Sequence, residues 1–479
     1  MKFLSPIFIS LIFSITAAYS SATFTSSISA QEKQGIQNFV ESALRSRSHA
    51  ITKVGIMVRS LDNGEIIYQR NANQLMIPAS VQKLLTAIAG LAYLGPNFTF
   101  NTSLLTDGSV HNGILDGNLV VKFSGDPSLK AADVSNLFRQ LAAQGVRQIQ
   151  GSVFIDNGDY NPSPYGAGWV QKDFNYYYAA PLNAIIINEN TFNLILKPSQ
   201  PNRQAIITSN LPPLAANFHN SLITTTGPRR ACSVAIHSDQ YNNYHISGCL
   251  VKKWGIQTSL LAIKDPNNYA KALVRQSLAQ NHIRFNGIIK MHHDMAAQKS
   301  LVVHQSAPLK TLIIRMLKKS DNMFANTLLK KIGQVYFRTT GTWENGAQAV
   351  KDIINQKAHI NLKDSIILDG AGLSHFNLLT PNQLSALLDY AYHDRNIAPY
   401  LISALPLSGV DGTLKHRMPH FQVRGKTGTL QSVSSLAGYL VTSKKHHLSF
   451  VIMVNGYKGR CYPYTHFQDQ ICQYLAHNA

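Results

Sequence analysis

Acidic residues are scarce in this chain, and several other common features are missing. Its 479 residues include 24 Asp and Glu against 44 Lys and Arg, which leaves a net charge of +20 at pH 7. Lysine and arginine never form a run longer than two residues, so the charge is a diffuse field and not a compact basic motif. No internal repeat or low-complexity linker is evident, which excludes repeat architectures.

Long apolar runs are also missing, except at the N-terminus. Residues 1–22 contain a run rich in Phe, Ile and Leu after Lys2 and end in small residues, the pattern of a cleavable secretory signal. An uncleaved anchor is the alternative, but the apolar core is short and contains Pro6. No cysteine marks a lipoprotein anchor, and no later segment is long and apolar enough to span a bilayer, so we expect no stable membrane anchor. We therefore expect a periplasmic or secreted protein. Its positive charge would attract anionic envelope polymers, and we do not expect it to bind nucleic acid.

Cysteine is nearly absent, and the four that occur fit an oxidising compartment. Cys232 and Cys249 lie close in sequence, as do Cys461 and Cys472, and local pairing predicts one disulfide in each pair. Metal binding is the alternative, but the spacing is not that of a zinc site. The 18 histidines form no ligand pattern either, so we expect no metal and no organic cofactor.

A serine and a lysine stand three residues apart at Ser80 and Lys83. Apolar residues from Val81 to Ala92 recur at three- and four-residue steps, which predicts a helix with one buried face. Residues i and i+3 share a helical face, so the two side chains are neighbours. A serine hydroxyl is a poor nucleophile until a base removes its proton, and a lysine can be that base if burial or a second cation lowers its pKa. A helix-capping serine beside a solvated lysine is the alternative.

Two further motifs follow far along the chain. Ser320–Asn322 (S-D-N) is a polar turn before an apolar helix, and Lys426–Gly428 (K-T-G) precedes two strand-like runs, 435–441 and 448–454. Each alone has an ordinary explanation, a helix cap or a hairpin. With S-x-x-K, and in this order, they form the motif set of penicillin-binding proteins and class A β-lactamases.

From about residue 35 to near its end, the chain resembles the D-alanyl-D-alanine carboxypeptidase/endopeptidases of the penicillin-binding protein 4 (DacB) type, which are class C low-molecular-mass penicillin-binding proteins. Besides the three motifs, four blocks carry the resemblance: 123–129, 178–184, 368–374 and 405–414. The pair Cys232 and Cys249 also resembles one in Gram-negative members, so the resemblance implies a Gram-negative periplasm.

The chain between the first two motifs is long enough for additional domains, because more than 200 residues separate Lys83 from Ser320. The resemblance implies an α+β fold: a β-lactamase/transpeptidase-like domain, with an antiparallel sheet flanked by helices, that is split by inserted domains, the innermost mostly β. Strand-like runs at 117–123 and 151–156, and a helical segment at 132–144, support the insert independently. The expected borders are 31–97 plus 304–479 for the catalytic domain, 98–190 plus 266–303 for domain II and 191–265 for domain III.

The resemblance further implies a serine D,D-peptidase of peptidoglycan, which needs no cofactor and which β-lactams acylate. Such an enzyme removes the terminal D-Ala from stem peptides, cleaves D-Ala–diaminopimelate cross-links, or does both. Ser80 would be the nucleophile and Lys83 its base, while backbone N–H groups of Ser80 and Thr429 would form the oxyanion hole. The other residues that the motifs assign are Ser320 and Lys426 for the proton of the leaving amine, Asn322 for orientation, and Lys426, Thr427, Gly428 and Thr429 for the substrate carboxylate.

Substrate recognition is expected from three further residues. Family members that recognise diaminopimelate present an aspartate and an aromatic residue from domain II, and Asp173 and Tyr178 match them. The family often has an arginine directly after the Gly-Leu-Ser of the third block, where this chain has His375. Histidine is a weaker and pH-dependent partner for a carboxylate.

Two other functions fit parts of the pattern. A β-lactamase shares the motifs, but the long insert argues against it, and no carboxylate motif is placed to activate a deacylating water. A non-catalytic cell-wall-binding protein would keep the fold but not the chemistry, and the intact motif residues argue against it.

Overall fold

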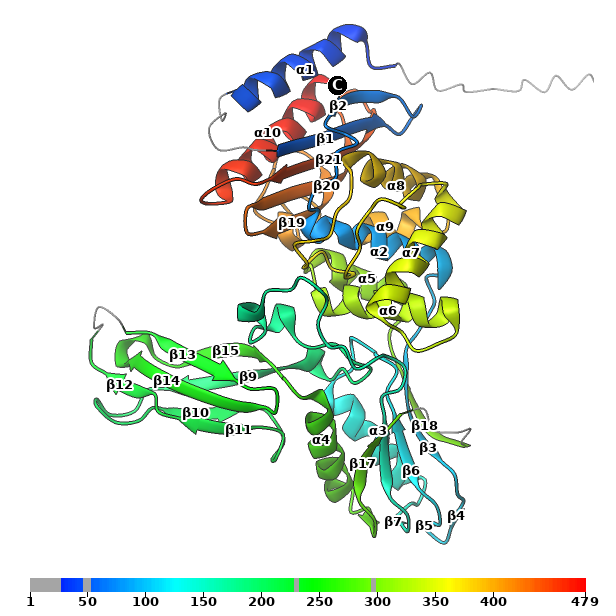
Figure 1. Ribbon diagram of the computed structural model, residues 1–479, viewed down its shortest axis with the longest axis vertical. Coiled ribbons are helices and arrows are strands. Elements are labelled where there is room, and N and C mark those ends of the chain that lie inside the picture. The colour runs from blue at the N-terminus through cyan, green and yellow to red at the C-terminus, as the bar shows by residue number, and fades with distance from the viewer. Residues whose placement is uncertain (1–26, 46–52, 228–231, 294–298) are drawn as a thin grey trace, which may run out of the picture.

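The computed structural model describes residues 27–45, 53–227, 232–293 and 299–479, so the predicted signal at 1–22 lies outside the described residues. No helix within these ranges has the length and apolar character needed to cross a membrane. The molecule is elongated, with an antiparallel sheet at one end, a helical layer in the middle and two β-rich regions at the other end (Figure 1).

The sheet at the end of the molecule that holds α1 (Ala30–Arg45) and α10 (Tyr462–Asn478) has five antiparallel strands in the order β19-β20-β21-β1-β2. Its strands are β1 (Lys53–Ser60), β2 (Ile66–Arg70), β19 (Val423–Leu430), β20 (Val433–Val441) and β21 (His447–Asn455). β20 and β21 are buried along almost their whole length, because helices cover both faces of the sheet. They coincide with the strand-like runs expected after K-T-G. β19, which carries K-T-G, is an edge strand.

Helices from both ends of the chain cover one face of this sheet. There α1 packs beside α10 over an apolar layer that includes Ile36 and Phe467 (Figure 1). The helices of the other face form the largest core of the molecule. They are α2 (Lys83–Tyr93), α5 (Leu309–Lys318), α6 (Asn322–Phe337), α7 (Trp343–Ala358), α8 (Pro381–His393) and α9 (Ala398–Ala404).

An insert of mixed helix and strand, here called the αβ insert, follows α2. Its five-stranded sheet has the order β17-β8-β6-β3-β18, and a four-stranded sheet has the order β16-β7-β5-β4. The predicted helix at 132–144 is α3, and the two predicted strands are β6 and β8. The bounds are β3 (Asn101–Thr106), β4 (Val110–His111), β5 (Ile114–Leu115), β6 (Leu119–Lys122), α3 (Ala131–Ala143), β7 (Gln148–Ile149), β8 (Val153–Asp156), α4 (Pro266–Gln280), β16 (Arg284–Phe285), β17 (Ile289–His292) and β18 (Lys299–Gln305).

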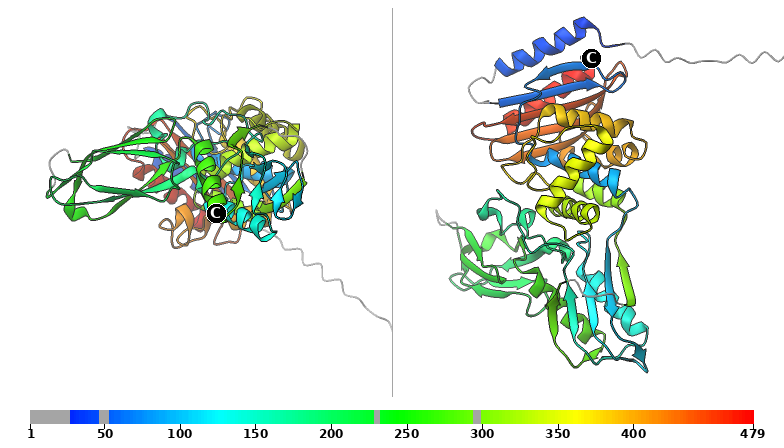
Figure 2. Two further views of the ribbon diagram at one scale, coloured as in Figure 1. Left: turned by 90° about the horizontal axis from the view of Figure 1, so that it is seen from below. Right: turned by 45° about the vertical axis from the view of Figure 1, so that its right-hand side comes forward.

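A second insert interrupts the first and consists of strands β9 to β15, here called the lateral β-region. It projects to one side of the molecule in two perpendicular views (Figures 1 and 2). Its strands form one three-stranded and one four-stranded sheet. They are β9 (Thr191–Lys197), β10 (Ile206–Ser209), β11 (Asn217–Asn220), β12 (Ile223–Thr225), β13 (Val234–Ser238), β14 (Asn243–Val251) and β15 (Gln257–Ala262). The α+β fold with a mostly β innermost insert is thus confirmed, while the numbered domain borders stay a prediction.

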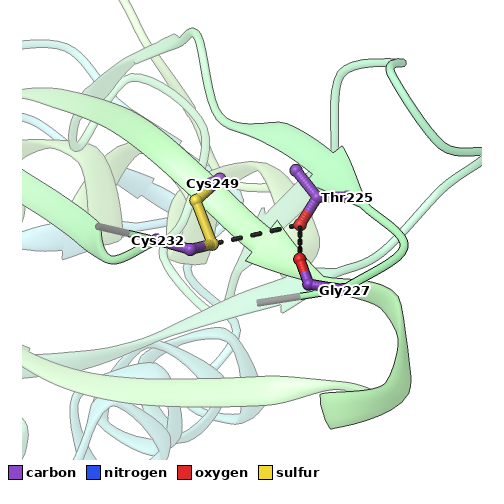
Figure 3. The surroundings of a disulfide bond; sticks show 4 residues. All are labelled: Thr225, Gly227, Cys232 and Cys249. Atoms are coloured by element: carbon purple, nitrogen blue, oxygen red, sulfur yellow. Dashed lines mark hydrogen bonds between the residues drawn. A yellow bond between two sulfur atoms is a disulfide. The ribbon is translucent and has the colours of Figure 1, made fainter. Parts of the chain in front are cut away.

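One of the two predicted disulfides is present and the other is wrong. Cys232 and Cys249 are bonded in the lateral β-region, next to Thr225, whose hydroxyl also bonds the Gly227 carbonyl (Figure 3). Cys461 and Cys472 are free thiols. Cys461 precedes α10 and Cys472 lies within it, so about eleven helical residues place them roughly 16 Å apart along the axis. A disulfide needs Cα atoms about 4.4–6.8 Å apart.

Candidate active site

Ser80 lies in a single 3₁₀ turn, η1 (Ala79–Gln82), that runs directly into α2. The residue before it, Ala79, has a positive φ of 49°, in the left-handed region that L-residues other than glycine seldom occupy. Such strain persists only where the surroundings enforce it, and it occurs preferentially at functional sites. Here the turn is held between β19 and the chain around residue 372.

Lys83 reaches back from the first turn of α2 to Ser80, as the i, i+3 spacing predicts. Its Nζ lies 2.9 Å from Ser80 Oγ, 2.7 Å from Asn322 Oδ1 and 2.8 Å from the Ala371 carbonyl oxygen. A neutral amine has two N–H donors and one lone pair. With the N–H groups directed at the amide and carbonyl oxygens, which can only accept, the lone pair faces the serine hydroxyl.

Burial makes this lysine suited to act as a base. Its side chain is fully inaccessible to solvent, and the loss of solvation lowers the pKa of Lys83 to about 7. The nearby carboxylates of Asp369 and Asp321 act in the opposite direction and raise that pKa. The sequence suggested burial or a second cation as the cause, and burial is the main one.

Ser320 and Lys426 form a second serine–lysine pair. Lys426 Nζ donates to Ser320 Oγ at 2.9 Å and to the Thr427 carbonyl at 2.7 Å. Lys426 is also fully buried, and desolvation followed by repulsion from Lys83 holds its pKa well below the usual value. Ser320 has a φ of 57°, so backbone strain marks this serine as well.

Asn322 joins the two motifs and the insert. While its side-chain oxygen accepts from Lys83, its Nδ2 donates to the backbone carbonyl of Tyr178 at 2.8 Å. Asp321 caps α6 through the backbone N–H groups of Met323 and Phe324. The hydrogen bonds of the Asn322 amide to Lys83 and to the Tyr178 carbonyl fix its orientation from both ends.

Two glycines allow the close approaches that build the site. A Cβ on Gly372, whose φ is +76°, would lie 1.9 Å from the Ala79 carbonyl oxygen. A Cβ on Gly428 would lie 2.9 Å from Ser80 N. Any side chain at either position would push the nucleophile turn away from its neighbours.

Asp369 is a structural centre of the site that sequence reasoning did not assign. It is fully buried, and its Oδ1 accepts from the backbone N–H groups of Ala371 and Gly372, while Oδ2 accepts from Ser374 N and from Trp169 Nε1. This carboxylate therefore shapes the turn whose Ala371 carbonyl holds Lys83. The signal was present as an aspartate directly before Gly-Ala-Gly in the third block.

The outer edge of β19 lies beside the nucleophile turn, and residues 406–408 pair with the first half of this edge, at residues 423–425. The N–H of Gly425 points outward and bonds the Pro406 carbonyl. Backbone groups of a strand alternate in direction with a two-residue period, so Thr429, four residues on, directs its N–H to the same edge. An unpaired edge can accept an extended peptide as an additional strand.

These residues open onto a cleft of about 720 Å³. Of the residues predicted from the sequence, the cleft is lined by Ser80, Asp173, Tyr178, Ser320, Asn322, His375 and Thr429. Lys83 and Lys426 are buried behind these. The Thr427 hydroxyl bonds Thr413 at 2.7 Å and does not line the cleft.

Residues from the αβ insert form the wall of the cleft beside the start of α6. The Tyr178 hydroxyl donates to Asp173 Oδ1 at 3.1 Å, and burial together with this carboxylate raises the pKa of Tyr178 to about 12. Asp173 and Tyr178 lie in two short 3₁₀ turns, η2 (Gln171–Asp173) and η3 (Tyr177–Ala179). His375 lines the same cleft from the loop after Gly372.

A charged cluster at the cleft wall was not predicted. Arg315 forms ion pairs with both Glu189 and Asp321. Desolvation and the neighbouring Glu189 raise the pKa of Asp321 to about 6, against the effect of Arg315. No group of three or more His, Cys, Asp or Glu side chains is placed to hold a metal ion within the described ranges.

Comparisons with known proteins agree with this geometry. The model of the D-Ala-D-Ala carboxypeptidase 3 (S13) family matches residues 37–477. The chain is 31% identical to D-alanyl-D-alanine carboxypeptidase DacB of Haemophilus influenzae over 85% of its length and 86% of that protein. It is 27% identical to the D-alanyl-D-alanine carboxypeptidase of Actinomadura sp. (strain R39), over 85% of its length and 78% of that protein.

A solved structure extends the likeness to three dimensions. The crystal structure of penicillin-binding protein 4 from Haemophilus influenzae superimposes with a TM-score of 0.84 at 29% identity, over 91% of this chain and 99% of that one. The same protein complexed with a β-lactam gives a TM-score of 0.78 at 28% identity and the same coverage. The resemblance inferred from the motifs is confirmed, and the chain belongs to the D-Ala-D-Ala carboxypeptidase 3 (S13) family.

Proposed function

We propose that this chain is a serine D,D-peptidase of peptidoglycan that acts through an acyl-enzyme on Ser80. The observation that carries the proposal is the fully buried Lys83, whose amine lies 2.9 Å from Ser80 Oγ and whose pKa is lowered to about 7. Near neutral pH such a lysine exists partly as the free amine, the form that accepts a proton.

Acylation would begin when Ser80 Oγ attacks the carbonyl carbon of the penultimate D-Ala. Lys83 takes the hydroxyl proton, and the carbonyl electron pair moves onto oxygen. The backbone N–H groups of Ser80 and Thr429 would bind that oxyanion; a single such donor is typically worth roughly 3–4 kcal/mol. When the carbonyl reforms, the C–N bond breaks and the electron pair leaves with the amine.

The departing amine needs a proton, and the second serine–lysine pair would supply it. Ser320 Oγ lies on the cleft wall with Lys426 Nζ 2.9 Å behind it, so the hydroxyl can give its proton to the amine and recover one from Lys426. Acylation leaves Lys83 protonated and Lys426 neutral, so Lys83 would first give up its proton, to Lys426 or to solvent. Water then attacks the ester with Lys83 again as the base, the Ser80 oxygen leaves with the proton that Lys83 took from water, and the shortened peptide is released.

The terminal carboxylate of the substrate would bind at β19. Lys426 is buried and its pKa is depressed. A carboxylate entering the site restores the charged form, because an opposite charge nearby favours the ammonium. The Thr429 hydroxyl and the backbone at Gly428 complete this site in our proposal. The Thr427 hydroxyl has Thr413 as its partner, so its role would need a change of rotamer.

Recognition of the rest of the peptide is proposed for the opposite wall. Asp173 and Tyr178 would bind the amino end of a diaminopimelate side chain, and His375 its carboxylate. Both walls line one cleft. We further propose that residues 1–22 direct the protein to the periplasm, where peptidoglycan and β-lactams would reach it.

Labelled penicillin tests the proposal. The wild type should form a stable adduct and release D-Ala from a pentapeptide, and Ser80→Ala should do neither while its circular dichroism stays unchanged. Rapid turnover of the penicillin would instead indicate a β-lactamase, and absence of an adduct in the wild type would indicate a non-catalytic wall-binding protein. Digestion of cross-linked muropeptides with mass analysis would separate carboxypeptidase from endopeptidase activity.

A further inference from the structure

A second hollow of about 890 Å³ adjoins the catalytic cleft. It lies between residues 171–177 and strands β13 and β15 of the lateral β-region. Lys172, Tyr177 and Leu260 line both this hollow and the cleft, so the two are direct neighbours. We call the second hollow the lateral groove. The chemistry proposed above makes no use of it.

Exposed aromatic rings stand at the junction of the groove with the cleft. Tyr176 and Tyr177 are 50% and 54% exposed. The Tyr176 ring is nearly parallel to that of Tyr178, with an angle of 5° and centroids 5.6 Å apart. Adjacent exposed aromatic rings beside a pocket are typical of a binding surface.

The walls of the groove are already held in place. The backbone oxygen of Asn175 accepts from Ala262 N at 3.1 Å, and its side chain accepts from Ser238 Oγ at 2.6 Å. Phe174 stacks on Tyr165 with ring centroids 3.9 Å apart. Lys264 Nζ donates to the Phe174 carbonyl oxygen at 2.9 Å. A preformed site loses little conformational entropy on binding.

The lining suits a sugar. It combines tyrosine rings with hydroxyl, amide, imidazole and ammonium groups, and no acidic side chain belongs to it among the described residues. A pyranose ring has an apolar C–H face that packs on an aromatic ring and hydroxyl groups around its rim. The hydrogen-bonding side chains that border the groove include Gln171, Lys172, Asn175, His237, Ser238 and Ser259.

We propose that the lateral groove binds the glycan strand that carries the stem peptide being cut. The inference rests on the proposed peptidase function. Four residues of a stem peptide separate the scissile carbonyl from the sugar, and four extended residues span about 13–14 Å. A peptide whose D-Ala end lies at Ser80, and which runs along the cleft toward the shared lining residues Lys172 and Tyr177, would bring its sugar to the groove.

Two variants of the full chain test this site without touching the catalytic residues. Tyr176→Ala removes a ring that lines the groove but not the cleft, and Ser259→Trp fills the groove from β15. The matched control is Tyr241→Ala, because Tyr241 is 64% exposed in the lateral β-region and lines neither hollow. Each variant is assayed on a free pentapeptide and on the same peptide attached to glycan strands.

The groove variants should raise KM for the glycan-attached substrate about five- to tenfold, which corresponds to one aromatic contact of about 1–1.4 kcal/mol. KM for the free pentapeptide and the rate of penicillin acylation should stay within about twofold of the wild type. The Tyr241 control should match the wild type on both substrates. A wild-type protein that is inactive on the free pentapeptide would refute the peptidase function and not the groove.

Three outcomes would overturn the assignment. The first is an equal change in KM on both substrates, which would make the groove a peptide site. The second is no change on either substrate with both groove variants. The third comes from direct binding to Ser80→Ala protein: peptide-free glycan strands that fail to bind saturably, or whose binding is unchanged by Tyr176→Ala, would exclude a glycan site. Salt-sensitive preference for lipopolysaccharide over those strands would point to an anionic polymer instead.

Discussion

Acylation of Ser80 by penicillin should accelerate about tenfold when the pH rises from 6 to 8. The reason is the lowered pKa of Lys83, about 7, which follows from its complete burial. At that pKa the free amine makes up roughly 9% of the lysine at pH 6 and roughly 90% at pH 8. An ordinary lysine would be neutral in only about one molecule in 2,500 at pH 7, so burial increases the available base roughly a thousandfold.

The assay is the second-order rate of adduct formation with a fluorescent penicillin between pH 5.5 and 8.5. Unfolding must be followed in parallel, because the same shift affects stability. The folded pKa of Lys83 lies below the unfolded value, so protonation favours unfolding: this penalty is complete below pH about 7 and disappears as the pH rises toward about 10.5. Melting temperatures at each pH separate the two effects.

A rate that is flat across this range, or that rises only above pH 9, would refute the reasoning, since either result means that Lys83 is not a base with a pKa near 7. Lys83→Ala serves as the control and should give no pH-dependent acylation at all. A normal pH-dependent rate in that variant would assign the base to another residue.

Other predictions follow from single contacts. Gly372→Ala should lower the acylation rate at least about tenfold by displacing the nucleophile turn; Gly64→Ala, with the same φ of +76° but no atom within 4 Å, should cost only about 1 kcal/mol of stability and keep activity. Cys232→Ser should lower the free energy of unfolding by about 3 kcal/mol in denaturant titrations. Peptide maps without reduction should find Cys472 as a free thiol, and a disulfide at Cys472 would contradict the structure. His375→Arg should strengthen cleavage of diaminopimelate peptides, because an arginine binds a carboxylate with two parallel hydrogen bonds; an equal effect on substrates with and without the diaminopimelate carboxylate would exclude this contact.

Local spacing predicted well what local geometry controls. Ser80 and Lys83 share a helical face by their i, i+3 spacing, and their atoms lie 2.9 Å apart. The same kind of reasoning failed for Cys461 and Cys472, because closeness in sequence implies closeness in space only where the chain turns back. Cys232 lies just before β13 and Cys249 lies within β14, so the antiparallel hairpin of these two strands brings them together and the bond forms.

The sequence by itself determined the three motifs and their order, since these depend on residue identity alone. Through the family resemblance that the motifs and four further blocks carry, it also implied the α+β class and the nested inserts. Only the tertiary structure decided that Lys83 is buried and that Asn322 and the Ala371 carbonyl hold it. The same is true of Asp369, which shapes the turn that contains Ala371. These contacts join residues up to 288 positions apart. Desolvation depends on everything packed around a group, so a lowered pKa, like the groove beside the cleft, exists only once the chain is folded.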